Sequence, residues 1–224
     1  MLLLKGKKYN FIFYILLIVF LTSTNNYNLI NVNLFSIKHI HVSGFSNEKN
    51  KSITDQIEDI AEKNIFFLEK NYFKKLFDRN DTKYLIIKKN YPNILILDFT
   101  PAKPLCIIQI KDNKIVLGDN GKKLDIKIES NNIPTVFGSD NFIEIFHVLN
   151  LLKSSKFEYK KIKNIIFLKS GRFDIDLNNG VMIKFPIDYN EEIIDYSSNL
   201  LSNKKFIDSK IIDLRIKNRI IKYD

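Results

Sequence analysis

The chain has 224 residues, room for one large domain or two small ones, and its 45% hydrophobic residues suffice for packed cores. Only 7 glycines and 5 prolines argue against a long disordered tract. The formal net charge is +10, but no arginine cluster or aromatic-interleaved basic stripe indicates a nucleic-acid-binding face. A single cysteine, Cys106, excludes an intrachain disulfide and, within an apolar run, is predicted to be a buried thiol.

An uncharged apolar block occupies residues 11–21 and predicts a transmembrane helix over 9–24. Such a helix is about 24 Å long, short against a hydrocarbon core of about 30 Å. Three lysines precede the block, so the positive-inside rule makes 1–8 a cytoplasmic tail and places the remainder outside the cytoplasm. A cleaved signal peptide is the alternative, although a small-x-small cleavage site is missing.

A polar linker is predicted for 25–36, followed by a small α/β unit over 37–104. Its expected elements are a strand at 37–42, a helix capped by Ser52 with a stripe of Ile53, Ile57, Ile60 and Ala61, a short helix with Tyr72, Phe73, Leu76 and Phe77 on one side, and strands at 84–89 and 94–99. The strand-helix-helix-strand-strand order predicts a sheet with helices covering one face.

Hairpin patterns dominate the second predicted unit, 105–224. Its expected strands are at 105–110, 114–117, 163–168, 173–177, 181–185, 211–214 and 219–223, and its expected helices are at 142–152 and around Ile193, Ile194, Leu200 and Leu201. The fold class is therefore α+β: an N-terminal transmembrane helix, a β-α-α-β-β unit, then a mainly antiparallel sheet with two helices.

Catalytic and metal-binding patterns are missing from the sequence. It has no glycine-rich phosphate loop, G-x-S-x-G or H-E-x-x-H. His39 and His41 share one face of a predicted strand, but a third metal ligand at suitable spacing is absent. We expect neither an enzyme nor a bound cofactor or metal.

Six local patterns, in order, resemble those of one bacterial family. They are IHVSG at 40–44, IKKNYPNILI at 87–96, LGDNG at 117–121, IPTVFG at 133–138, GRFDIDLNNG at 171–180 and IDLRIKNRI at 212–220. Together they resemble the FtsQ/DivIB family of bacterial cell-division proteins, and the last is the closest match. The resemblance implies a POTRA domain at 37–104 and a β domain at 105–224.

The resemblance also implies a function. Members of this family are expected to be non-enzymatic scaffolds of the inner membrane that act at the division septum, link early to late division proteins, and bind small FtsB-like and FtsL-like partners. The implied recognition mode is addition of a partner strand to an edge of the β domain. We place that edge in the terminal region 211–223.

The implied partner-binding residues belong to this region and to the hairpin before it. They are Arg172, Arg215, Ile216, Lys217, Asn218 and Arg219. Arg215 offers a planar donor fork to a partner carboxylate, although a solvated or internally paired arginine fits the sequence equally well. Two other functions remain open: a different POTRA-containing membrane-anchored interaction protein, and an anchored periplasmic hydrolase.

Overall fold

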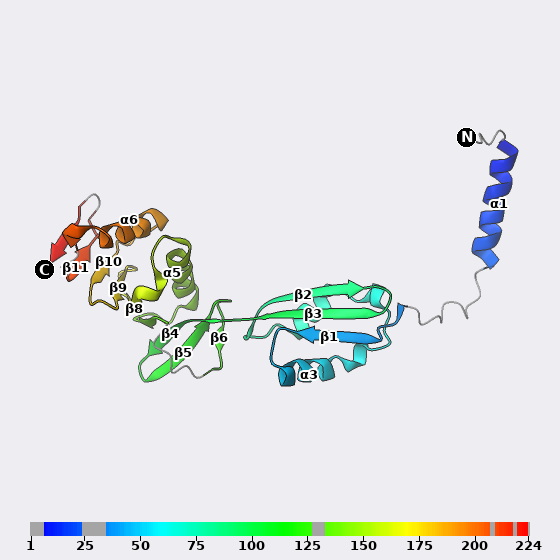
Figure 1. Ribbon diagram of the computed structural model, residues 1–224, viewed down its shortest axis with the longest axis horizontal. Coiled ribbons are helices and arrows are strands. Elements are labelled where there is room, and N and C mark those ends of the chain that lie inside the picture. Colours follow the sequence, from blue (N-terminus) through cyan, green and yellow to red (C-terminus); the bar gives the residue numbers. More distant parts are fainter. Residues whose placement is uncertain (1–6, 24–34, 127–132, 207–208, 217–218, 224) are drawn as a thin grey trace. The chain divides into compact units, whose positions relative to one another are not determined.

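The computed structural model describes residues 7–23, 35–126, 133–206, 209–216 and 219–223. Chain contacts divide the protein into two compact units. The first comprises residues 1–73 and 86–98, and the second comprises 74–85 and 99–224 (Figure 1).

The N-terminal helix α1 (Lys7–Ser23) corrects one prediction. It has 17 residues, and the side chains of 11–21 are all exposed. Across the described ranges, which begin at residue 7, the structure contains no helix with both the length and the apolar character needed to cross a membrane. The predicted transmembrane helix over 9–24 is therefore wrong, because α1 rises only about 25 Å against a hydrocarbon core of about 30 Å.

The first folded region contains the predicted order of two helices and three strands. Its elements are β1 (His39–Ser43), α3 (Asn47–Gln56), 3₁₀ helices Glu58–Ile60 and Ile65–Phe67, α4 (Lys70–Leu76), β2 (Thr82–Asn90) and β3 (Ile94–Pro101). The strands form a sheet in the order β1-β3-β2, and β1 runs parallel to β3. Leu95 and Leu97 of β3 are buried while their neighbours are less so, which is the alternation of a sheet covered on one face.

Both helices of this region differ in detail from the prediction. Ser52 does not cap a helix, because α3 begins five residues earlier, at Asn47. The apolar stripe extends past the end of α3 at Gln56, where the chain tightens into the 3₁₀ helix Glu58–Ile60. In α4, Phe73 is buried but Tyr72 is exposed, so the predicted apolar side of this helix is narrower than its composition indicates.

A nine-stranded mixed sheet and two helices make up the rest. The elements are β4 (Pro104–Ile110), β5 (Asn113–Gly118), β6 (Lys123–Leu124), β7 (Thr135–Phe137), α5 (Phe142–Ser154), 3₁₀ helix Tyr159–Lys161, β8 (Ile162–Phe167), β9 (Phe173–Leu177), β10 (Met182–Lys184), α6 (Glu191–Leu201), 3₁₀ helix Lys204–Phe206, β11 (Ile211–Asp213) and β12 (Ile221–Tyr223). The strand order is β12-β11-β10-β9-β8-β7-β4-β5-β6. Most neighbours are antiparallel, as predicted, but β10–β11, β4–β7 and β7–β8 pair parallel.

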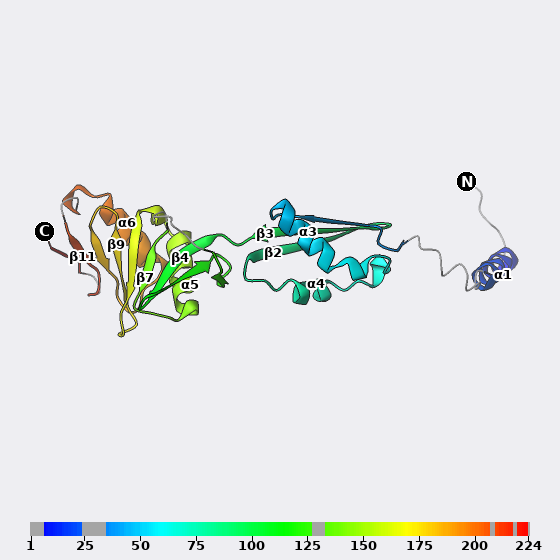
Figure 2. The same ribbon diagram turned by 90° about the horizontal axis from the view of Figure 1, so that it is seen from below.

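A single row of aliphatic side chains crosses six strands of this sheet, from β4 to β11. The paired residues in this row, all fully buried, are Ile108, Val136, Ile165, Ile175, Ile183 and Ile212. They share a core with Ile145 and Leu149 of α5 and Ile194 of α6, so both helices cover this face (Figure 2). The alternate residues of β9, β10 and β11 point to the opposite face.

Candidate functional site

Most of the predicted partner-binding residues belong to the segment that connects β11 to β12. Arg215, Ile216 and Arg219 lie in this connection, whereas Lys217 and Asn218 lie outside the described residues. The backbone N–H of Arg219 donates to the carbonyl oxygen of Ile216 at 3.1 Å, which closes a turn. The side chains of Arg215, Ile216 and Arg219 are exposed, so the turn presents them at the surface.

The carboxylate of Asp213 anchors this connection. Asp213 is only 3% exposed. It accepts hydrogen bonds from the backbone N–H of Arg215 at 3.0 Å and from its Nε at 2.8 and 2.9 Å. Hydrogen bonding from the Arg215 side chain lowers the pKa of Asp213 below its usual range, and the same bond raises the pKa of Arg215. Arg215 is thus internally paired, as the sequence allowed, with a side chain still 34% exposed.

Charged residues from three neighbouring strands form a row on the sheet face opposite the helices. The strand register sets Lys184 of β10 beside Asp174 of β9 and beside Asp213 of β11. Burial raises the pKa of the Asp174 carboxyl, and the positive charges of Lys184, Arg172 and Arg215 oppose that rise. Arg172 and Arg215, far apart in sequence, therefore both lie close to one carboxylate.

Three cations and two carboxylates make up this cluster: Arg172, Lys184 and Arg215 against Asp174 and Asp213. Its formal charge is +1, from three positive and two negative groups. Within the described part of the chain, Arg172 Nε and Asp174 Oδ1 are buried without a hydrogen-bond partner. Buried polar atoms are normally satisfied, so these two unpaired atoms mark this face as a candidate polar contact.

A cavity of about 640 Å³ adjoins the connection on its other side. Its walls come from the β10–α6 loop, the first turns of α6 and the β11–β12 connection. The lining residues are Pro186, Asp188, Asn190, Glu192, Ile193, Tyr196, Leu214, Arg215, Ile216, Arg219 and Ile220. The loop is fixed where it enters α6, because Asn190 caps the helix by accepting the N–H of Ile193 at 3.0 Å.

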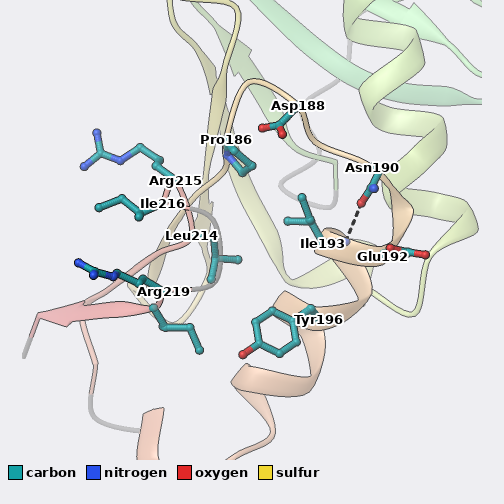
Figure 3. Close-up of a pocket in the computed structure, with 11 residues that line it drawn as sticks. Pro186, Asp188, Asn190, Glu192, Ile193, Tyr196, Leu214, Arg215, Ile216 and Arg219 are labelled. Atoms are coloured by element: carbon teal, nitrogen blue, oxygen red, sulfur yellow. Dashed lines mark hydrogen bonds between the residues drawn. The ribbon is translucent and has the colours of Figure 1, made fainter.

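The side chains around the cavity separate into two groups in Figure 3. Leu214 points toward Ile193 and Tyr196 of α6, which makes an apolar wall (Figure 3). Arg215 and Arg219 extend to the opposite side of the connection, together with Ile216 (Figure 3). The connection therefore has an apolar side toward α6 and a basic side, and residues of both sides line the cavity.

The terminal strands differ in their suitability as an edge. β12 is the outermost strand at one end of the sheet and pairs antiparallel with β11 alone. β11 lies between β10 and β12, so the first part of the predicted edge region 211–223 is interior. The other end of the sheet is β6, with two residues. The longer terminal edge is thus next to the basic cluster and the cavity.

Comparisons with known proteins bear directly on identity. No family model matches the chain. "Cell division protein FtsQ" of Rickettsia bellii is 23% identical over 203 residues, covering 88% of this chain and 75% of the relative. The Rickettsia typhi protein of the same name is 22% identical over the same shares. Both relatives support placing the chain with the FtsQ/DivIB family. They likewise support a role for the chain in cell division.

One solved structure from the same family was also found by comparison. The major extracytoplasmic domain of DivIB from Geobacillus stearothermophilus aligns with a TM-score of 0.34 and 15% identity, covering 47% of this chain and 90% of that domain. The support for the FtsQ/DivIB family comes from the two sequence relatives, whose alignments span most of both chains.

Several residues of the candidate site are not among those predicted from the sequence. Asp174 and Lys184 give a usable signal, since each lies between a buried phenylalanine and a buried isoleucine of its segment. Tyr196 and Ile193 give no such sequence signal, because their positions on an amphipathic helix fit core packing equally well. Among the described residues, no group of three or more His, Cys, Asp or Glu side chains is placed to hold a metal ion.

Proposed function

We propose that this protein is a non-enzymatic scaffold of the divisome that binds FtsB-like and FtsL-like partners at the β12 end of its nine-stranded sheet. A partner strand adds to β12, and its flanking side chains reach the basic cluster and the cavity. The observation that carries the proposal is the position of β12: the terminal strand lies beside both features.

Strand addition suits this end of the sheet. An added strand gains affinity from main-chain hydrogen bonds and specificity from the side chains that flank it. β12 has its only strand neighbour on the β11 side, among the described residues. The register of β12 is fixed by three residue pairs, from Ile211 with Tyr223 to Asp213 with Ile221. The strand is therefore a firm template for a partner.

Charge provides the selectivity in this proposal. Arg215, held by Asp213, has few orientations to lose when it meets a carboxylate, and Arg219 is exposed four residues later. Arg172 adds a donor whose Nε has no partner among the described residues. These three arginines favour an acidic partner segment, with Lys217 and Asn218 part of the same proposed contact.

The cavity supplies a place for an apolar anchor. Interfaces draw most of their binding energy from a few side chains that fill desolvated pockets. Leu214 and Ile193 form an apolar wall, and Tyr196 offers a ring with a polar end. A large apolar side chain of the partner, placed just beyond the added strand, fits this requirement.

The remaining parts of the proposal concern domains and chemistry. We assign residues 37–104 to a POTRA domain and 105–224 to a β domain. The non-enzymatic character is supported by Cys106, because burial raises the pKa of its thiol to about 12 and keeps it from acting as a thiolate nucleophile at neutral pH.

Titration calorimetry of the full chain with an FtsB-like peptide tests the binding site. Ile216→Glu sets a negative charge beside the arginines and removes an apolar contact, so we expect affinity to fall at least about ten-fold, or roughly 1.4 kcal/mol. Ile143→Glu is the matched control, because Ile143 is also an exposed isoleucine and lies on α5, outside the cavity lining. Equal affinities for the two variants, with both folded by circular dichroism, would refute the site.

Cellular position tests the function more broadly. A fluorescent fusion of the full chain is expected to concentrate at the division septum, and Ile216→Glu is expected to reduce recruitment of the FtsB-like partner there. A diffuse signal in dividing cells would contradict the scaffold role, whatever the result of the calorimetry.

A further inference from the structure

An aromatic cluster lies at one end of the three-stranded sheet, and none of its residues belongs to the proposed partner site. The rings of Phe66 and Tyr91 stack with centroids 4.7 Å apart, and Phe35 meets Phe66 edge-on at 4.8 Å. The start of β1, the end of β2 and the start of β3 come together at this end (Figure 1). The cluster thus gathers three separate segments of the chain.

These rings face outward, because the local backbone is fixed in a way that exposes them. In the 3₁₀ helix Ile65–Phe67, Ile65 is fully buried, whereas Phe66 is 52% and Phe67 is 83% exposed. Asn64 fixes the turn by accepting the N–H of Phe66 at 2.9 Å. Tyr91 is also 52% exposed. Contiguous exposed apolar side chains of this kind mark interaction surfaces, and their fixed backbone means that little entropy is lost on contact.

Three lysines lie at the same end of the sheet as the aromatic cluster. The Nζ atom of Lys89 donates to the carbonyl oxygen of Phe66 at 3.2 Å, which holds an ammonium group at the rim of the rings. Lys88 precedes it and is exposed, and the backbone N–H of exposed Lys38 bonds to the hairpin at Asn93. Glu62 and Glu69 are exposed acidic residues of the neighbouring segments, against Lys38, Lys70, Lys88 and Lys89, while Lys63 pairs with Asp59. The rim therefore carries a net positive charge.

We infer that this end of the first unit, defined by Phe66, Phe67, Tyr91, Lys38, Lys88 and Lys89, binds the surface of an anionic lipid bilayer. Exposed phenylalanine rings enter the boundary between headgroups and acyl chains, while a tyrosine stays at headgroup level with its hydroxyl in water. The surrounding ammonium groups match anionic headgroups. Charge complementarity selects the lipid surface over an apolar protein groove.

The chain has no tryptophan, so a single introduced one reports on its own site. Phe67→Trp in the full chain is mixed with vesicles of phosphatidylglycerol and phosphatidylethanolamine that carry brominated acyl chains. We expect a blue-shifted emission and strong quenching. Ile143→Trp is the matched control, since Ile143 is 84% exposed against 83% for Phe67. Lipid binding through any other part of the full chain leaves that second site in water.

At least two-fold greater quenching at position 67 than at position 143 supports the inference, and equal quenching overturns it. Adding Lys88→Glu to Phe67→Trp is expected to raise the lipid concentration at half-maximal quenching about five-fold. This is the order expected for one basic side chain at an anionic surface. Lys114→Glu, another exposed strand lysine, is expected to have no such effect. Quenching that is unchanged by Lys88→Glu, or equal with pure phosphatidylcholine, overturns the charge-based selection.

Discussion

Gly138 directly follows β7, and a substitution there tests how tightly the nine-stranded sheet is packed. Its φ angle is +82°, a conformation that side chains with a Cβ rarely adopt. A Cβ atom at this position falls 2.0 Å from the carbonyl oxygen of Phe167, at the end of β8. Real Cβ atoms stay at least about 3.0 Å from such an atom. Gly138→Ala must therefore displace one of two paired parallel strands.

The magnitude has two separable parts. The left-handed backbone alone costs about 1–2 kcal/mol for a residue with a Cβ. Forcing β7 away from β8 adds about 1–3 kcal/mol, the usual size of an overpacking penalty. We therefore expect Gly138→Ala to lower the free energy of unfolding by about 2–5 kcal/mol. Gly180→Ala is the control, because Gly180 has φ +85° and open space within 4 Å of its Cβ position.

Urea unfolding of the full chain, followed by circular dichroism, measures both variants. Gly180→Ala is expected to lose only the backbone part, about 1–2 kcal/mol, so the two midpoints differ while the slopes stay the same. Hydrogen exchange in β7 and β8 is expected to increase more in Gly138→Ala. Equal losses in the two variants would refute the packing argument and leave only the backbone conformation.

Three further predictions concern single hydrogen bonds. Arg215 lowers the folded-state pKa of Asp213, so this carboxylate stabilises the protein above the ordinary carboxyl pKa of about 4. The stabilisation is lost as the pH falls through the lower folded-state pKa. In acid titrations, Asp213→Asn is expected to make the free energy of unfolding less dependent on pH below about pH 4. Tyr159→Phe removes a hydroxyl that donates to the carbonyl oxygen of Leu105 at 2.7 Å, and we expect a loss of about 1 kcal/mol in urea unfolding. Asn190→Ala removes the α6 N-cap, and a loss of about 1 kcal/mol with faster exchange in the first turn of α6 is expected.

Local sequence patterns predicted the elements in which apolar residues recur with a clear strand or helix spacing. Strand β9 occupies 173–177 as predicted, because its buried and less buried residues alternate. The helix α5 begins at Phe142 as predicted, with Asn141 as its cap. Ser46 and Ser52 are both cap-type residues, so the local sequence offers two starts for the helix. The structure uses the first, because α3 begins at Asn47 directly after Ser46.

Long-range contacts were not predictable in the same way. β7 has three residues with a single buried side chain, Val136, so it has no period to detect. It exists because β4 and β8 pair with it in parallel from both sides. The ion pair of Asp213 with Arg215 could be proposed from their spacing, but the burial of Asp213 depends on strands that lie elsewhere in the sequence.

The aliphatic row that ends at Ile212 has a consequence for recognition. The next residue is Asp213, so a slip of β11 by one position would exchange an isoleucine for a carboxylate in the core. Every side chain of that strand would change face at once, and burying the Asp213 carboxylate among isoleucines, away from Arg215, opposes this strongly. Pairing with β11 transmits the same alignment to β12. A partner that binds β12 thus pairs with an outer strand whose register depends on the six strands of the aliphatic row.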